Sequence, residues 1–250
     1  MASSEADLTG KVVRHERLIV GLGVVLLTLL GWWYIAAGAG MRGGGMSGNM
    51  GAMRAPPIGA LILMWWLMMV AMMLPSAAPA VLLYGRVREV RGGDSAIARS
   101  WVLLAGYLAV WLLFSLVAAG TQRLLAGPSM ALDNPLAEGA LLVTAGLYQL
   151  SPLKNACLAR CRSPAQFLSR HWRPDWTGAV RLGVLHGWDC VGCCWMLMAL
   201  LFVGGVMNLL WIVALTLIVT LEKLLPRGDW FGRAAGIALC AWGVLRIAGF

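Results

Sequence analysis

The feature that most constrains this sequence of 250 residues is a series of seven long apolar runs. A helix needs roughly 20 apolar residues to cross about 30 Å of lipid hydrocarbon, and most of the runs are close to that length. They comprise residues 18–37, 58–83, 101–119, 137–153, 179–206, 208–221 and 231–248, of which the fourth and the sixth are the shortest. We therefore predict an all-α fold, a polytopic transmembrane helical bundle of about seven spans that is embedded in a lipid bilayer.

The composition excludes a cytosolic enzyme and a disordered chain, because 60% of the residues are apolar and only 12% are charged. A soluble domain carries about twice that charged share. The net charge of +9 would indicate nucleic-acid binding in a soluble protein, but here the cations follow the predicted topology. With a cytoplasmic N-terminus, only Arg42, Arg54, Arg123 and Arg246 of the 20 Lys and Arg residues fall outside. We predict an N-in, C-out orientation and no nucleic-acid partner.

The chain is expected to form a single membrane domain over residues 1–250. Within it we distinguish a cytoplasmic tail (1–17), a Gly/Met-rich outer loop (38–57) and a basic, Cys-containing inner segment (151–178). The sequence Ala37-Gly38-Ala39 resembles a signal-peptidase site. The apolar run before it is longer than the 7–15 residues usual in a signal peptide, so an uncleaved first span is the preferred interpretation.

Five of the six cysteines lie within residues 157–194. Cys157 and Cys161 are one helical turn apart, and Cys190, Cys193 and Cys194 also share one helix face. Thiolates suit Cu(I), zinc or an iron–sulfur cluster, and the cations around the first pair favour thiolate over thiol. The sequence thus predicts a metal site, provided that segment 151–178 folds back so that the two sets meet. The alternatives are packing of small side chains between helices and redox pairing of Cys161 with Cys190.

Two further polar residues accompany the second cysteine set. Asp189 lies inside an apolar run, where a carboxylate is costly and usually pairs with a cation or a metal, the alternative being a protonated, hydrogen-bonded carboxyl group. His186 is one turn before Cys190 and is a candidate ligand, although a hydrogen bond to a helix carbonyl is an equal alternative. Glu222 and Lys223 end run 208–221 and are expected to form an ion pair at the membrane boundary, the alternative being that Glu222 turns inward and extends the site.

The chain has 14 methionines, and two groups of them are candidate Cu(I) ligands because thioethers are soft donors. The first group lies in the outer loop, where packing gives no reason for apolar side chains. The second follows helical spacing on run 58–83, where filling of core gaps is the alternative. The predicted ligands are Met41, Met46, Met50 and Met53 in the loop and Met68 and Met72 in the run.

Three stretches resemble a known family. They are MMVAMMLP at residues 68–75, YQLSPLKNACLARCRSP at 148–164 and GVLHGWDCVGCCWMLM at 183–198. Together with Glu222, Lys223 and Pro226, they are similar to the bacterial family of predicted metal-binding integral membrane proteins of unknown function. The resemblance covers most of the chain from about Ile58 onward. It implies a multi-pass protein of the bacterial inner membrane, with the five clustered cysteines as the metal-binding residues.

From these observations we expect a metal-binding membrane protein that handles a soft metal, with Cu(I) preferred over zinc or an iron–sulfur cluster, in transport or as a metallochaperone. One alternative is an accessory or assembly subunit of a larger membrane complex, with partner subunits contacting the Cys and Met rows. Another is a membrane thiol–disulfide oxidoreductase. Since there is neither an ATP-binding phosphate loop nor an evident nucleophile–base pair, an enzyme is the less favoured interpretation.

Overall fold

The computed structural model describes residues 2–38, 57–91, 96–125, 132, 134–225 and 228–249, with the side chains of the first helix described from residue 18 onward. Within these ranges the regular structure is helical, which confirms the predicted all-α class. The helices are α1 (Ala2–Ala36), α2 (Ile58–Val90), α3 (Ala96–Leu125), α4 (Pro135–Leu150), α5 (Pro152–Arg162), α6 (Pro164–His171), α7 (Trp176–Ala199), α8 (Leu201–Gly204), α9 (Leu209–Leu224) and α10 (Gly228–Ile247).

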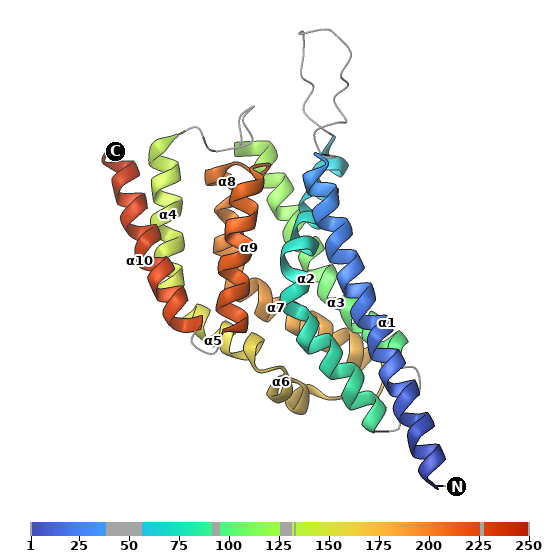
Figure 1. The fold of residues 1–250 in the computed structure, drawn as a ribbon. Helices are drawn as coiled ribbons and strands as arrows, with labels where there is room; N and C mark the ends of the chain where they lie inside the picture. The colour runs from blue at the N-terminus through green and yellow to red at the C-terminus, as the bar shows by residue number, and fades with distance from the viewer. Residues whose placement is uncertain are drawn as a thin grey trace.

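The long helices stand side by side and alternate in direction (Figure 1). Helices α1, α3, α7 and α10 run one way, and α2, α4 and α9 run the other way. Helices α4 and α10 pack together at one side, α1 to α3 form the other side, and α9 contacts both α2 and α10. The short helices α5 and α6 lie across one end of the bundle (Figure 1). Helix α5 is near the end of α9 and the beginning of α10, and α6 contacts α2.

Among the described residues, four helical segments are long and apolar enough to cross a membrane: Leu18–Ala36, Ile58–Val90, Ala96–Leu124 and Trp176–Gly204. Length and composition therefore support four of the seven predicted spans. The other three predicted spans correspond to shorter or more charged helices. Helices α4 and α9 have 16 residues each, and α10 has 20 residues with Asp229 near its start and Arg246 near its end.

Segment 151–178 contains two short helices because its sequence carries start signals for both. Pro152 and Pro164 stand at the first positions of α5 and α6, where a missing backbone N–H costs nothing. The Ser151 side chain accepts a hydrogen bond from the Lys154 backbone N–H at 3.2 Å and so caps α5. The segment thus turns away from α4 and folds back under the bundle.

Glycines let α3 and α7 approach closely. A Cβ on Gly183 would clash with the carbonyl oxygen of Leu103, and a Cβ on Gly106 would lie 2.7 Å from the carbonyl oxygen of Val180. Small residues commonly serve this purpose where helices cross in membrane proteins. This approach brings the cysteine face of α7 next to Tyr107 of α3.

Candidate metal centre

The two helices that carry the five clustered cysteines, α5 and α7, pack against each other. On α5, Lys154, Cys157 and Cys161 lie on one face, because they follow a spacing of three and four residues. On α7, Cys190, Cys193 and Cys194 are all buried. The cysteine faces of the two helices therefore meet, although Cys161 and Cys190 are 29 positions apart in the chain.

Cys190 lies at the centre of a group of sulfur atoms. The thiols of Cys193 and Cys194 donate hydrogen bonds to the carbonyl oxygen of Cys190, at 3.1 and 3.0 Å. The thiol of Cys161 lies close enough to those of Cys190 and Cys193 to interact with them. From α2, the thioether of Met73 accepts a hydrogen bond from the thiol of Cys194 at 3.7 Å. We call Met73, Cys161, Cys190, Cys193 and Cys194 the sulfur cluster.

Two polar groups from other helices contact the sulfur of Cys190. The Tyr107 hydroxyl of α3 lies 3.1 Å from it. The ammonium of Lys223, on α9, donates to it at 3.0 Å and also contacts Ser76 Oγ at 3.2 Å and Met73 Sδ at 3.9 Å. Lys223 is buried, so a positive charge lies beside the sulfur cluster away from solvent.

Cys157 lies close to α7 at a different point. Its sulfur packs on Gly192, where a Cβ would come within 2.8 Å of it, and the Arg160 guanidinium contacts it at 3.6 Å. Burial raises the pKa of the Cys157 thiol, and the nearby Arg160 only partly offsets this. Hydrogen bonds with Cys190 and Cys193 raise the pKa of the Cys161 thiol. The expectation that flanking cations favour thiolate at these two positions was therefore wrong, because burial and thiol contacts dominate.

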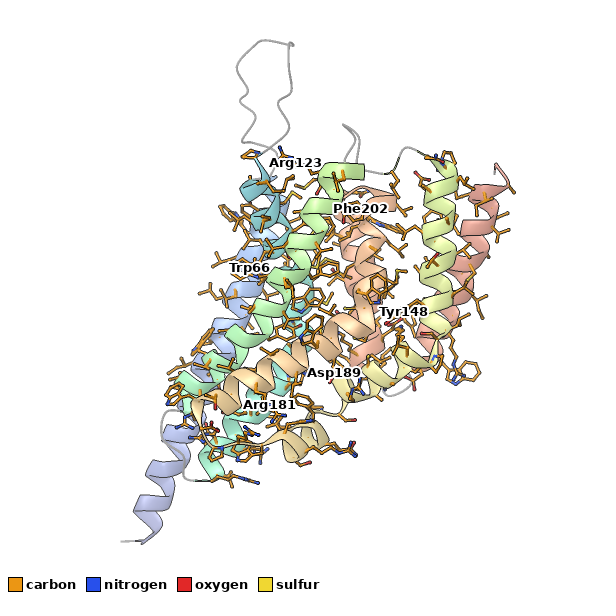
Figure 2. All side chains as sticks on the ribbon, turned by 180° about the vertical axis from the view of Figure 1, so that it is seen from behind. Trp66, Arg123, Tyr148, Arg181, Asp189 and Phe202 are labelled. Atoms are coloured by element: carbon orange, nitrogen blue, oxygen red, sulfur yellow. The ribbon has the colours of Figure 1, made fainter. Side chains whose placement is uncertain are left out.

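Asp189 forms an ion pair with Arg160 of α5, at 2.7 Å between Oδ1 and Nε. Figure 2 shows it on the side of α7 that faces α5. It has thus taken a cation as its partner, the first of the two partners expected from the sequence. His186 is buried between the rings of Tyr107 and Phe167, with centroids 5.7 and 5.6 Å away. Among the described residues, its Nδ1 atom has no hydrogen-bond partner.

The expected Glu222–Lys223 ion pair was wrong. Glu222 instead pairs with Lys154 of α5 at 2.6 Å, and Gln149 Nε2 donates to its other carboxylate oxygen at 2.5 Å. Successive residues in a helix point about 100° apart, so these neighbours face different helices. Glu222 binds Lys154 of α5, and Lys223 contacts the sulfur cluster.

Of the predicted methionine ligands, Met68 and Met72 are buried on α2. The α2 thioether that contacts both Cys194 and Lys223 belongs to Met73, one position along the helix. The other predicted ligands, Met41, Met46, Met50 and Met53, lie outside the described residues.

Sequence reasoning also missed Lys223 as a contact of the cysteines. The available signal was a lysine in the last turn of an apolar run, since such residues usually face the interior and find a partner there.

A family model described as PpoB2, copper chaperone, matches residues 62–246 of the chain. The match spans most of the chain. This protein belongs to the PpoB2 copper chaperone family. Comparison with curated proteins and with solved structures finds no match for it. The expectation of a metal-related family is therefore confirmed, and the family description suggests copper as the metal.

The region that matches the PpoB2 family contains every residue of the sulfur cluster, together with Tyr107 and Lys223. It begins after the Gly/Met-rich segment 38–57. The family resemblance therefore bears on the Cys-centred site in the helices and leaves Met41, Met46, Met50 and Met53 as a separate prediction.

The donor set of this PpoB2 family member fits copper. Thiols and a thioether are soft ligands of the kind that select Cu(I). Within the described residues, no group of three or more His, Cys, Asp or Glu side chains is arranged to hold a metal ion. Closed structural zinc sites have four such ligands in tetrahedral order. The Met73 thioether beside Cys194 adds a donor outside that set, and thioethers are soft donors.

Proposed function

We propose that this protein is a multi-pass membrane copper chaperone that binds Cu(I) at the sulfur cluster. The observation that carries the proposal is the meeting of Cys161 from α5 with Cys190 and Cys193 from α7, beside Met73 of α2. Three chain segments far apart in sequence thus supply soft donors at one place. Membership of a copper chaperone family supports copper as the bound metal.

Cys190 is the central ligand in this proposal because it contacts Cys161, Tyr107 and Lys223. Cys161 is partly exposed and lies on the short helix α5, so it is the thiol best placed to pass the ion to or from a partner. His186, with its unpartnered Nδ1 one turn away from Cys190, is an additional candidate ligand. Asp189 acts through Arg160 and positions α5.

The proposed topology keeps seven crossings with the N-terminus in the cytoplasm. Helix α4 is about 24 Å long at 1.5 Å per residue, a length that local bilayer thinning accommodates. Large apolar side chains on the three helices in question face outward, as lipid contact requires. They include Leu147 of α4, Leu210 of α9 and Ile237 of α10, at 60%, 83% and 62% exposure.

The distribution of cations supports the same orientation. Figure 2 shows Arg181 toward the end of the bundle where α5 and α6 lie, whereas Arg123 is at the opposite end. The positive-inside rule assigns the Arg-rich end to the cytoplasm. In a bacterium this proposal corresponds to the inner membrane, and the outer-loop methionines would then collect Cu(I) on the other side.

The test is copper retention by the full-length protein in detergent, under reducing conditions and against a competing Cu(I) chelator. We expect Cys190→Ser, and the double variant Cys190→Ser/Cys194→Ser, to lose most of the bound copper. Cys240→Ser is the matched control, because Cys240 lies on α10 near Val143 of α4. Wild-type protein that yields its copper as readily as Cys190→Ser would refute the proposal.

The closeness of Cys161 and Cys190 favours one second candidate, a thiol–disulfide oxidoreductase. Such an enzyme would oxidise these two thiols to a disulfide while reducing a partner disulfide. The Cys161→Ser variant would then trap a mixed disulfide through Cys190 that gel analysis without reductant detects. An adduct in protein that binds no copper would support this candidate. An assembly role in a larger complex would instead appear as a stable partner that copurifies without metal.

A further inference from the structure

Lys223 carries a charge that the other ionic groups around the sulfur cluster do not balance. Asp189 is paired with Arg160, and Glu222 is paired with Lys154. In the part of the chain that the structure describes, the Lys223 ammonium instead contacts Cys190, Ser76 and Met73. No carboxylate among these contacts neutralises it, so its natural counter-charge is the sulfur cluster itself.

We propose that Lys223 makes the sulfur cluster selective for a monovalent over a divalent metal ion. The inference rests on the proposed Cu(I) site. Net charge is costly in a buried, weakly polar environment, and it is most costly in a membrane. Two thiolates, one Cu(I) and one ammonium add up to zero charge. The same two thiolates with Zn(II) and the ammonium leave one positive charge unbalanced.

Contacts around Lys223 show that its charge is held in place. Its ammonium has three neighbours from two helices, Met73 and Ser76 of α2 and Cys190 of α7. The lysine therefore need not be a ligand to influence which metal binds. It is a positioning residue that sets the charge of the site, and removing its charge should change metal preference more than ligand geometry.

The experiment measures Cu(I) and Zn(II) affinities of the full-length protein in detergent, each by competition with a chromophoric chelator. The variant Lys223→Met keeps the length of the side chain and removes its charge. We expect its Cu(I)-over-Zn(II) preference to fall on the order of a hundredfold relative to wild type, the size expected for one uncompensated buried charge. Lys223→Arg keeps the charge and should retain the preference.

A second variant leaves the lysine in place. Ser76 Oγ lies 3.2 Å from the ammonium, so Ser76→Asp would set a carboxylate against it and neutralise it. The preference should fall as in Lys223→Met, whereas Ser76→Ala, the matched control, should leave it unchanged. Comparison of Ser76→Asp with Ser76→Ala therefore tests the effect of the Lys223 charge on metal preference even if Lys223→Met does not fold.

An unchanged Cu(I)-over-Zn(II) preference in both Lys223→Met and Ser76→Asp would overturn the inference while leaving the copper site intact. Wild-type protein that binds no Cu(I) would instead overturn the proposed function. The two failures are therefore distinguishable in one set of titrations.

Discussion

The Lys154–Glu222 ion pair offers the most direct test of how the site is held together. Its two side chains are 1% and 2% exposed, and the charged atoms are 2.6 Å apart. Removing one partner of a buried pair leaves an uncompensated charge and costs about 3–5 kcal/mol. For a chain of this size, each kcal/mol corresponds to roughly 2–4 °C in Tm. Glu222→Gln should therefore lower Tm by about 6–20 °C.

Lys154→Met should destabilise the protein by a similar amount, because it leaves the Glu222 carboxylate without its cation. The double variant Lys154→Met/Glu222→Gln removes both charges and should be less destabilised than the sum of the single variants. The control is Glu138→Gln, which breaks the more exposed pair with Arg246 and should cost less than about 1 kcal/mol.

Unfolding of the detergent-solubilised protein, followed by circular dichroism against temperature or denaturing detergent, measures these differences. Single variants that each cost less than about 1 kcal/mol, with additive effects in the double variant, would show that the two charges do not depend on each other. The placement of α5 described above would then be wrong.

Two further predictions concern helix packing and pH. Gly183→Val should destabilise the protein by about 1–3 kcal/mol or more, because its side chain would clash with the Leu103 carbonyl of α3. Gly120→Val, where a Cβ meets nothing within 4 Å, is the control in the same thermal unfolding assay, and equal effects would refute the packing argument. Burial raises the pKa of the Cys157 thiol in the folded protein. The buried thiol therefore contributes to stability below the usual thiol pKa of about 8.5. This contribution is lost as the pH rises through the pKa that the thiol has in the folded protein. Unfolding curves from pH 7 to 10 should show a smaller loss of stability in Cys157→Ala than in wild type, and parallel curves would contradict the assignment.

Much of the helical framework could be predicted from the sequence, because apolar run length and helix caps are local signals. Each of the seven runs is mostly helical, and Ser151-Pro152 marks the start of α5. The number of membrane-spanning helices is harder to predict. The 16-residue helix α9 is short for a span, and its contact with the membrane depends on the helices around it.

The residues that form the site were harder to predict from the sequence, because they depend on how each helix is rotated about its own axis. The row of methionines on α2 could be recognised, but Met73 rather than Met72 turns toward Cys194. The sequence predicted an ion pair between the neighbours Glu222 and Lys223, but in the structure each faces a different helix. Spacing within one helix tells which residues share a face, and only packing decides what that face meets.

Helix α5 supplies Cys161 to the sulfur cluster, but its position depends on contacts with other helices. It has 11 residues, which is too short for a helix to be stable alone in water. Three of its cations reach three different helices: Lys154 to Glu222 of α9, Arg160 to Asp189 of α7, and Arg162 to Asp229 of α10.

These ion pairs fix α5 against three helices. Arg160 also lowers the pKa of the Cys157 thiol, but the opposite effect of burial is larger, so the main role of the α5 cations is to hold the helix in place. The α5 half of the sulfur cluster therefore depends on the packing of α7, α9 and α10 around α5. A fragment that contains both cysteine stretches but lacks α9 and α10 would lose two of these three ion pairs and, with α9, the Lys223 charge.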